Sequence, residues 1–500
     1  MAEFKQLLED TGEVGYVEEV YRSIIYVSGL PKARPMEVVM FENGGVGQVI
    51  SLLPDYIEVL LLTNQLITVG TKVARTGDLM KVNTGMHLLG KNINPLGLSK
   101  GVVNKIHKES QSRLIDIPPP GMSVRKNITR PFETGVSMVD MIIPLGKGQR
   151  ELVVGDRKTG KTQLLIQSMV NQARKGMVCI YAAIAKKRMD IKSIENIFNQ
   201  MGVTKNTIIV ATSSADPAGL IYLTPFTAMT IAEYFRDVGY DVYIVLDDLS
   251  AHAKLYREIM LLAKRFPGRN SYPGDIFYLH SRLLERAGNF EFIKKDNKGN
   301  LVKLETSITC LPVAELTLGD LSGYIQTNLM AMTDGHILFD TDLYNQGRRP
   351  AINPFISVTR VGRQAQTNLL RDINRQVTKF MVYIQKLREF LHFGAELSES
   401  TQRTIAMGDR ITSFFDQPVD KIINVNVSTL IMGALWGGYW RTEPINQMKT
   451  DLYNILNLYN TDKAYGGKID KLIESSENLA DLVTAIKDDE SLILKKERNK

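Results

Sequence analysis

The chain has 500 residues, of which 44% are apolar and 23% are charged, and its formal net charge is +7. This composition is that of an ordinary folded protein with room for about three domains. The modest positive charge, part of which belongs to the C-terminal KKERNK segment, gives no argument for a nucleic-acid partner.

The sequence shows no targeting signal. The N-terminal MAEFKQLLEDTG has no apolar core and is not a signal peptide. The longest apolar stretch, VSTLIMGALWGGYW at 427–440, is shorter than the roughly 20 residues of a membrane helix and predicts a buried helix. Cys179 and Cys310 lie in apolar strand-like runs, which favours buried reduced thiols. We expect a cytoplasmic protein that meets the inner face of the cell membrane only through partner proteins.

Three kinds of pattern follow one another along the chain. Short alternating runs with Gly, Asn and Pro between them predict a small antiparallel β-barrel at 1–90. Residues 91–365 begin with a stiff connector that contains Pro118, Pro119 and Pro120. Strands and helices then alternate, as in a parallel sheet with crossover helices. Apolar strands are predicted at 152–154, 178–184, 207–211 and 242–246, and helical periodicity over 366–500 predicts a bundle.

A phosphate-binding loop lies at the start of the α/β region. The apolar run Leu152–Val154 leads into GDRKTGKT, and an amphipathic helix follows, which is the strand, loop and helix order that this motif requires. Glycines at both ends would allow positive φ and bring backbone N–H groups close to phosphate oxygens. The candidate ATP-binding residues are Gly155, Asp156, Arg157, Lys158, Thr159, Gly160, Lys161 and Thr162.

Two residues of this loop have specific roles in the prediction. Lys161 would reach the β- and γ-phosphates, and the Thr162 hydroxyl would bind Mg²⁺. Asp247, at the end of the strand DVYIVLDD, would hold the water shell of the metal. The alternative is that Asp247 and Asp248 are solvated loop residues.

Hydrolysis would also require a carboxylate to orient the attacking water. The next strand, CIYAAI, is followed by Ala185 and Lys186, and the first acid after it is Asp190. A charged lysine accepts no proton, which leaves Asp190 as a weak alternative base. The sequence therefore predicts a site that binds ATP and is poorly equipped to split it.

Arg360, in ISVTRVG, follows the last strand of the core. On composition alone it is either a structural partner of an acidic side chain or an arginine finger that enters a neighbour's site. The spacing does not distinguish the two roles.

The motifs GQRELVVGDRKTGKT, IVLDDLSAHAKLYREI, PGRNSYPGDIFYLHSRLLERAG, TDGHILFDTDLYNQGRRPAIN and ISVTRVG resemble the alpha subunit of F-type ATP synthase. ARTGDLMKV, LLGKNINPLG and LREFLHFGAELSESTQ resemble it too, so that the likeness covers nearly the whole chain. It implies a β-barrel, a RecA-like α/β domain and a helical bundle. It also implies an alternating ring of three alpha and three catalytic beta subunits around a central gamma-type shaft.

The resemblance assigns roles to single residues. Lys161, Thr162 and Asp247 would hold a non-exchanging Mg-ATP, and Arg360 would be lent to the beta subunit's catalytic site. Gln417 matches one of the family's adenine-side glutamines, whereas Val419 replaces the second. The missing base also fits, because alpha subunits lack the catalytic glutamate of beta subunits.

Several positions depart from the family. Lys186 and Lys158 stand where glutamine is usual, Asn270 replaces an acidic residue, and 289–305 is a longer, charged segment that predicts an exposed insertion or hairpin. Only some eleven residues precede the barrel, where the family carries a stator-binding helix of about twenty. This pattern resembles F-type-like ATPases of mycoplasmas, and we expect a hydrolytic motor such as gliding machinery. The alternatives are an ordinary proton-translocating synthase and, more remotely, a self-sufficient hexameric RNA translocase.

Overall fold

The computed structural model describes residues 2–99, 110–295, 301–391 and 398–493. Contacts between residues divide the chain into two units. Unit 1 comprises Met1–Asn127, Ala173–Leu316 and Asp320–Thr333, and unit 2 comprises Ile128–Gln172, Thr317–Gly319 and Asp334–Lys500. The KKERNK segment and the middle of LREFLHFGAELSESTQ lie outside the described residues. The division at residues 90 and 365 stays a prediction.

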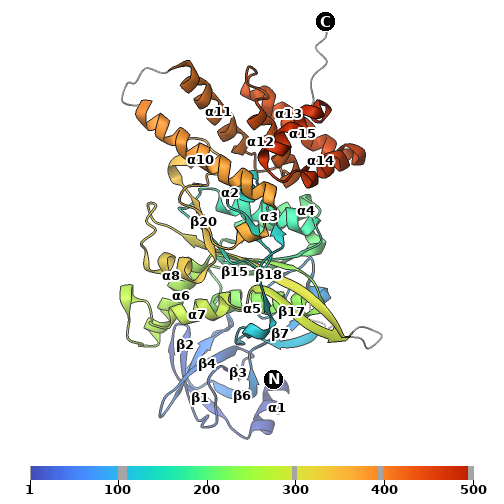
Figure 1. The fold of residues 1–500 in the computed structure, drawn as a ribbon. Helices are drawn as coiled ribbons and strands as arrows, with labels where there is room; N and C mark the ends of the chain where they lie inside the picture. Colours follow the sequence, from blue (N-terminus) through green and yellow to red (C-terminus); the bar gives the residue numbers. More distant parts are fainter. Residues whose placement is uncertain (1, 100–109, 296–300, 392–397, 494–500) are drawn as a thin grey trace. The chain divides into compact units, whose positions relative to one another are not determined.

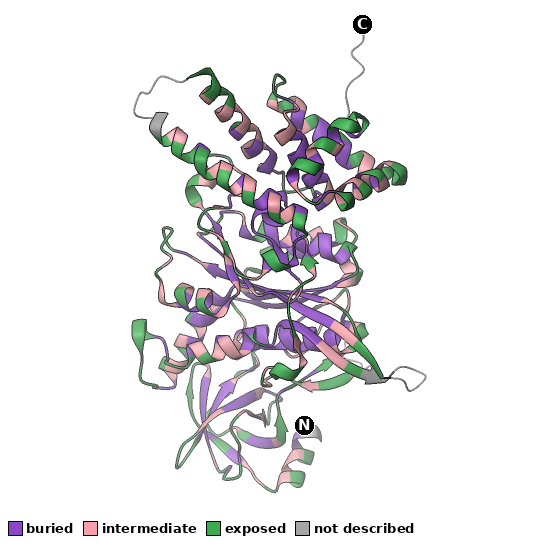
Figure 2. Cartoon of the chain, viewed as in Figure 1, coloured by how far each residue is buried: buried purple, intermediate pink, exposed green. Residues whose placement is uncertain are grey.

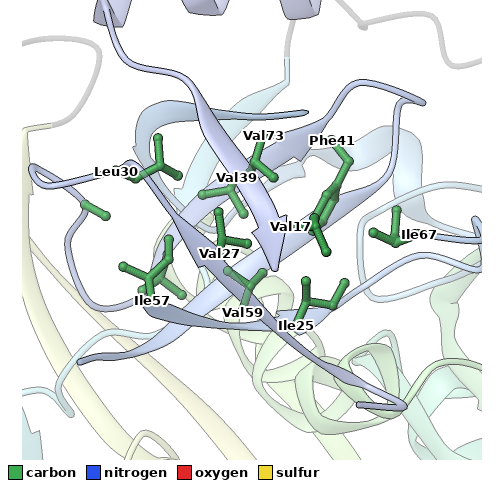
Figure 3. Close-up of a cluster of buried hydrophobic side chains, with 12 residues drawn as sticks. Val17, Ile25, Val27, Leu30, Val39, Phe41, Ile57, Val59, Ile67 and Val73 are labelled. Carbon is green, nitrogen blue, oxygen red and sulfur yellow. The ribbon is translucent and has the colours of Figure 1, made fainter. Parts of the chain in front are cut away.

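The N-terminal part of unit 1 contains the predicted β-barrel (Figures 1 and 3). A helix, α1 (Ala2–Thr11), precedes it. The strands close in the order β1-β2-β5-β4-β3-β6, and all neighbours are antiparallel. Alternate side chains, such as Val39 and Phe41 of β3, point into a core of buried aliphatic residues. The strands are β1 (Gly15–Tyr21), β2 (Ile24–Ser28), β3 (Glu37–Phe41), β4 (Val46–Leu52), β5 (Ile57–Leu61) and β6 (Lys72–Leu79).

Unit 1 also contains a run of parallel strands in the order β18-β16-β14-β15-β8. Three of the four predicted strands are found here, with their side chains buried along almost their whole length, as Figure 2 shows for the central strands. This agrees with a parallel sheet covered on both faces. The strands are β8 (Asn92–Ile93), β14 (Val178–Lys186), β15 (Thr207–Ser213), β16 (Val242–Asp247) and β18 (Leu301–Glu315).

Helices connect these strands. The long helix α5 (Ala218–Val238) packs on β14, β15 and β16 and is buried over most of its length, which confirms the helix predicted at TPFTAMTIAEYFRDVG. Two shorter strand pairs also belong to unit 1: β7 (Lys81–Thr84) with β9 (Gln111–Leu114), and β10 (Arg125–Lys126) with β17 (Gly288–Lys295). The other helices are α4 (Arg188–Gln200), α6 (Leu249–Leu262), α7 (Ile276–Leu284) and α8 (Tyr324–Met332).

The charged insertion at 289–305 is a hairpin, as predicted. Strand β17 (Gly288–Lys295) pairs antiparallel with the first half of β18, with Gly288 opposite Ile308 and Lys295 opposite Leu301. Lys126 lies between Glu291 (2.6 Å) and Glu305 (3.3 Å) at its base. The two cysteines are buried and unbridged, as expected. Over the described residues, no helix is both long and apolar enough to cross a membrane.

Unit 2 contains the fourth predicted strand, β13 (Glu151–Gly155). It is fully buried and pairs in parallel with β19 (Gly335–Phe339), which in turn pairs antiparallel with β20 (Val358–Thr359). Helix α3 (Lys161–Arg174) follows β13, and α9 (Thr341–Asn345) follows β19. The short pair β11 (Pro131–Phe132) and β12 (Leu145–Gly146) flanks α2 (Ser137–Ile142), whose residues are all buried.

The predicted helical region completes unit 2. The apolar stretch at 427–440 falls mainly in α12, which is buried as predicted and packs against α14, α15 and α2. The amide of Asn374 donates to the carbonyls of Met141 (2.8 Å) and Ile142 (2.9 Å) at the end of α2. The helices, orange to red in Figure 1, are α10 (Asn368–Leu391), α11 (Glu399–Phe415), α12 (Val425–Gly437), α13 (Ile445–Thr461), α14 (Lys463–Ser475) and α15 (Leu479–Asp488).

Candidate nucleotide-binding site

The phosphate loop connects β13 to α3 inside unit 2. Positive φ occurs at Lys158 (63°) and Gly160 (100°). The expectation of positive φ at Gly155 is wrong. Glycine is needed there for space, because a Cβ would lie 2.6 Å from the Phe339 carbonyl oxygen and 2.7 Å from the Phe339 Cβ on β19. The loop therefore starts with a close strand contact and turns only three residues later.

Side chains hold this loop in shape. The Thr159 hydroxyl donates to the Asp156 carbonyl at 2.8 Å. The carboxylate of Asp156 accepts from the Thr341 hydroxyl at 2.8 Å and from the backbone N–H of Gly319 at 3.2 Å. Asp156 thus joins the loop to the segment after β19 and does not face a phosphate as a bare negative charge.

Lys161 is the first residue of α3 and is buried. Its ammonium donates to the carbonyl oxygens of Gly155 (2.7 Å) and Asp156 (2.5 Å), which hold the positive charge over the loop. Thr162, Arg157 and Lys158 are exposed. The first N–H groups of a helix have no partner within it, so that this end of α3, the lysine and the threonine hydroxyl together suit a phosphate with a bound cation.

The carboxylate predicted to serve the metal, Asp247, lies at the end of β16 in unit 1. Asp247 is 2% exposed. The Lys186 ammonium lies 2.7 Å from its Oδ1, and the Tyr181 hydroxyl donates to its Oδ2. Burial opposes the charge on Lys186, but Asp247 and Asp248 outweigh it and raise the lysine pKa. Asp247 is thus already neutralised by a cation of the chain itself.

Asp248 has a structural role. Its carboxylate caps α6 by accepting from the backbone N–H of Ala251, and it lies 3.6 Å from the Lys186 ammonium. Burial raises its pKa to about 6, against the opposing effect of Lys186. The alternative base, Asp190, lies in the exposed first turn of α4. The described part of the chain holds no group of three or more His, Cys, Asp or Glu side chains that could bind a metal ion by themselves.

Arg360 follows β20, as predicted, and its side chain is exposed. Its backbone N–H donates to the Asp334 carbonyl at 2.9 Å. Over the described residues, no hydrogen bond or ion pair engages its guanidinium group. The Asp334 carboxylate forms an ion pair with Arg150, whose Nη2 lies 2.8 Å from its Oδ1. The buried Glu151 of the same unit lies close enough for Arg360 to lower its pKa, so both roles proposed for Arg360 stay predictions.

Gln417 is buried in unit 2. Its amide donates to the carbonyls of Gly135 and Lys421, both at 2.7 Å, and accepts from the backbone N–H of Ser137 at 3.0 Å. An adenine that used this amide would displace one of these bonds. The adenine contact of Gln417 stays a prediction, and the observed role of the side chain is to join α2 to the segment after α11.

Two functional candidates were missed from the sequence. Tyr181 is one, because its hydroxyl donates to Asp247. The sequence offered only a polar hydroxyl within an apolar strand as a sign of this contact. Glu151 is the other: it is 1% exposed, accepts from the Gln149 amide at 2.7 Å, and burial raises its pKa well above the usual value. A glutamate at the start of an apolar strand was the available signal for this second residue.

Fold and site together define a phosphate-loop nucleotide-binding protein with an N-terminal barrel and a C-terminal helical region. Residues 135–359 match the family model described as ATP synthase alpha/beta family, nucleotide-binding domain, and residues 366–488 match the C-terminal domain of the alpha/beta chain. The chain belongs to this family, as an alpha subunit of the F-type ATP synthases.

Two curated relatives show how far the likeness extends. ATP synthase subunit alpha of Carsonella ruddii (strain PV) is 36% identical over 444 residues, which cover 89% of this chain and 92% of that protein. ATP synthase subunit alpha 2 of Shewanella frigidimarina (strain NCIMB 400) is 36% identical over 454 residues, which cover 90% and 88%. The resemblance drawn from the motifs is thereby confirmed over nearly the whole length of the chain.

Proposed function

We propose that the chain is the non-catalytic, ATP-binding alpha-type subunit of an F-type-like rotary ATPase. Three copies would alternate with three beta-type subunits around a gamma-type shaft, and each would lend Arg360 to a beta site that hydrolyses ATP. The phosphate loop would hold the triphosphate through Lys161 and the start of α3. A bound Mg²⁺ would supply charge neutralisation, with Thr162 as the residue of this chain that contacts it.

The observation that carries the non-catalytic assignment is the ion pair of Lys186 with Asp247 at 2.7 Å. A general base must be able to accept a proton. The strand that follows α3 in the chain ends in a lysine, whose pKa is raised and which stays charged at neutral pH. Asp247, which lies beside this lysine, forms an ion pair with it and accepts a hydrogen bond from the Tyr181 hydroxyl.

The first experiment compares the purified chain with the chain assembled with its beta-type partner. The isolated chain should bind Mg-ATP and turn it over negligibly, and activity should appear on assembly. Lys161→Ala should abolish ATP binding by the isolated chain. Hydrolysis by the isolated chain at normal rates, lost in Lys161→Ala, would refute the assignment.

The arginine finger is tested in the assembled complex. Arg360→Lys should lower kcat by about 10³-fold or more, because a lysine lacks the planar fork that contacts the transferring phosphoryl group. ATP binding by the isolated variant should be unchanged. Arg363→Lys, three residues further and also exposed, is the matched control and should retain activity. Equal activity of the two variants would contradict the role of Arg360.

The load of the motor is a separate question. Both relatives are named as ATP synthase subunits, which favours the proton-translocating synthase. The other candidate is a hydrolytic motor with a different load, such as gliding machinery. Affinity purification from native cells distinguishes them: delta-type and proton-channel subunits would indicate a synthase at the inner face of the membrane, and cytoskeletal partners would indicate the other load.

A further inference from the structure

Unit 2 contains a cavity of about 350 Å³ that is separate from the phosphate loop. It is lined by the segment after α9, by α10 and by α11, and Met138 of α2 contributes to its wall. Neither the loop residues 155–162 nor Gln417 line it. Its volume is within the range of about 300–1,000 Å³ that is usual for small-molecule sites.

The floor of the cavity depends on a close approach of two helices. Gly408 of α11 faces Ile384 of α10, and a Cβ at position 408 would lie 2.9 Å from two carbons of the Ile384 side chain. The neighbouring walls are apolar: Ile384 and Phe415 are each 3% exposed and Met138 is 8% exposed. These walls would receive the hydrophobic part of a ligand and do not suit a highly charged one.

The cavity is also lined by three arginines, Arg348, Arg349 and Arg388, against a single acid, Asp416. Asp416 accepts from the backbone N–H of Arg349 (2.9 Å) and pairs with Lys449 (2.9 Å). The positive charge of the lining is therefore incompletely balanced from within it.

The three arginines differ in their partners. The Arg388 guanidinium pairs with Asp409. That of Arg349 donates to the carbonyls of Tyr344 (3.0 Å) and Arg348 (2.7 Å) and lies 3.7 Å from the centre of the Tyr344 ring.

The guanidinium of Arg348 has no hydrogen bond or ion pair among the described residues. Burial, followed by the like charge of Arg388, lowers the Arg348 pKa, against the opposing effects of Asp416 and Asp409. An anion beside Arg348 would accept hydrogen bonds from its guanidinium group and would reduce the repulsion from Arg388.

We propose that this cavity binds a small amphiphilic carboxylate, with its carboxylate group on Arg348 and an apolar body of about a dozen non-hydrogen atoms against Ile384, Phe415 and Met138. A carboxylate matches the planar fork of a guanidinium group. A polyphosphate would place several charges against apolar walls, at a large desolvation cost. The site is independent of the proposed rotary function.

The probe is naphthalene-2-carboxylate, titrated into the full-length chain and followed by calorimetry. We expect saturable one-to-one binding with Kd of about 1 mM or tighter. Binding should persist in saturating Mg-ATP and in Lys161→Ala, because the cavity is separate from the phosphate loop. Arg348→Met should weaken binding at least about tenfold, the usual effect of losing a charge-assisted hydrogen bond. The uncharged naphthalene-2-carboxamide should bind equally weakly to both proteins.

Two further variants keep the test decisive. Met381→Trp should fill part of the cavity and block the probe without touching an arginine. Arg403→Met, on α11 with its side chain 77% exposed, should bind as the unaltered chain does. Melting temperatures show whether each variant is folded. Equal affinity for the acid and the amide, unchanged binding in Arg348→Met, tighter binding of inorganic phosphate, or no binding up to about 10 mM would overturn the proposal.

Discussion

The ammonium group of Lys186 lies 2.7 Å from one oxygen of Asp247, and the Tyr181 hydroxyl donates to the other. Both oxygens of a carboxylate predicted to order the waters of Mg²⁺ are therefore occupied. Glutamine, the residue that the resemblance leads one to expect at position 186, would carry no charge. Lys186 therefore supplies Asp247 with a positive charge from the chain itself.

Removal of this cation should make ATP binding more dependent on the metal. In Lys186→Gln, the ratio of the ATP Kd in EDTA to the Kd in Mg²⁺ should rise by about tenfold, because Asp247 becomes available to the metal's water shell. The variant should also melt at a lower temperature, since a buried carboxylate loses its partner. Lys187→Gln, at the exposed neighbouring position, is the control. An unchanged ratio in Lys186→Gln would show that Asp247 takes no part in metal binding.

At Gly155, the absence of a Cβ atom is what allows β13 to lie close to Phe339 of β19. In Gly155→Ala the new Cβ would collide with Phe339 backbone and side-chain atoms at 2.6–2.7 Å. We expect a loss of about 1–3 kcal/mol in the free energy of unfolding, measured by urea denaturation, and weaker ATP binding. Gly121→Ala is the control, because no atom lies within 4 Å of a Cβ there. Equal stability of the two variants would contradict the close contact with β19.

At the scale of elements, α6 and α7 are joined by a buried pair of histidines. The Nδ1 of His252 lies 3.1 Å from the Nε2 of His280, and the Nε2 of His252 lies 3.0 Å from the Tyr222 carbonyl. Since a carbonyl only accepts, His252 donates from Nε2 and its Nδ1 accepts from His280. Burial lowers the His252 pKa to about 4 and the His280 pKa well below its usual value. Both rings are therefore neutral in the folded chain at neutral pH.

This pair should make unit 1 sensitive to acid. The unfolded histidines take up protons below pH 6.5 while the folded ones do not, so the stability present above pH 6.5 is lost as the pH falls towards 4. At pH 5 the loss from His252 is about 2 kcal/mol. In His280→Gln, chemical denaturation at pH 7 and pH 5 should show a smaller loss between the two. Lys254→Gln, on the exposed face of α6, should keep the full loss. An identical loss in all three proteins would exclude the pair as its source.

The sequence predicted best those elements whose apolar residues form a single clear pattern. The runs before Gly155, at Val178, at Thr207 and at Val242 became strands within three residues of their predicted ends, because buried parallel strands are nearly continuous in apolar residues. Polar partnerships were not predictable, since they join residues far apart in the chain. The contact of Asp156 with Thr341 spans 185 positions, and the bond between Gln417 and Ser137 spans 280. Neither leaves a local pattern.

At the scale of the whole molecule, each unit is built from separate stretches of chain. In unit 2, the helical region supplies hydrogen-bond partners to polar groups of α2. The Asn374 amide donates to the last carbonyls of α2, and the Ser428 hydroxyl lies 2.9 Å from that of Ser137. The predicted boundary at residue 365 is thus not a point where the chain can be cut without leaving buried polar groups unpaired.

A chain that ends at residue 365 should therefore fail to fold cooperatively. Loss of α10 and α12 exposes the buried side chains of α2, such as Met141, and removes the partners of its carbonyls. Thermal melting followed by circular dichroism should show a broad or missing transition. A sharp transition in the shorter chain would show that the helical region is dispensable for the rest.

The division of the chain between two units also determines the order in which its parts can fold during synthesis. The barrel can close once residue 79 has left the ribosome, because all of its strands precede that point. Unit 1 is complete at residue 333, whereas the last buried side chains of unit 2 among the described residues, Leu492 and Ile493, follow α15. The phosphate loop at 155–162 is therefore synthesised well before β19 and long before the helices that complete its unit. Residues 128–172 therefore lack the contacts of β19 and of the helical region during this interval, in which exposed apolar side chains favour misfolding.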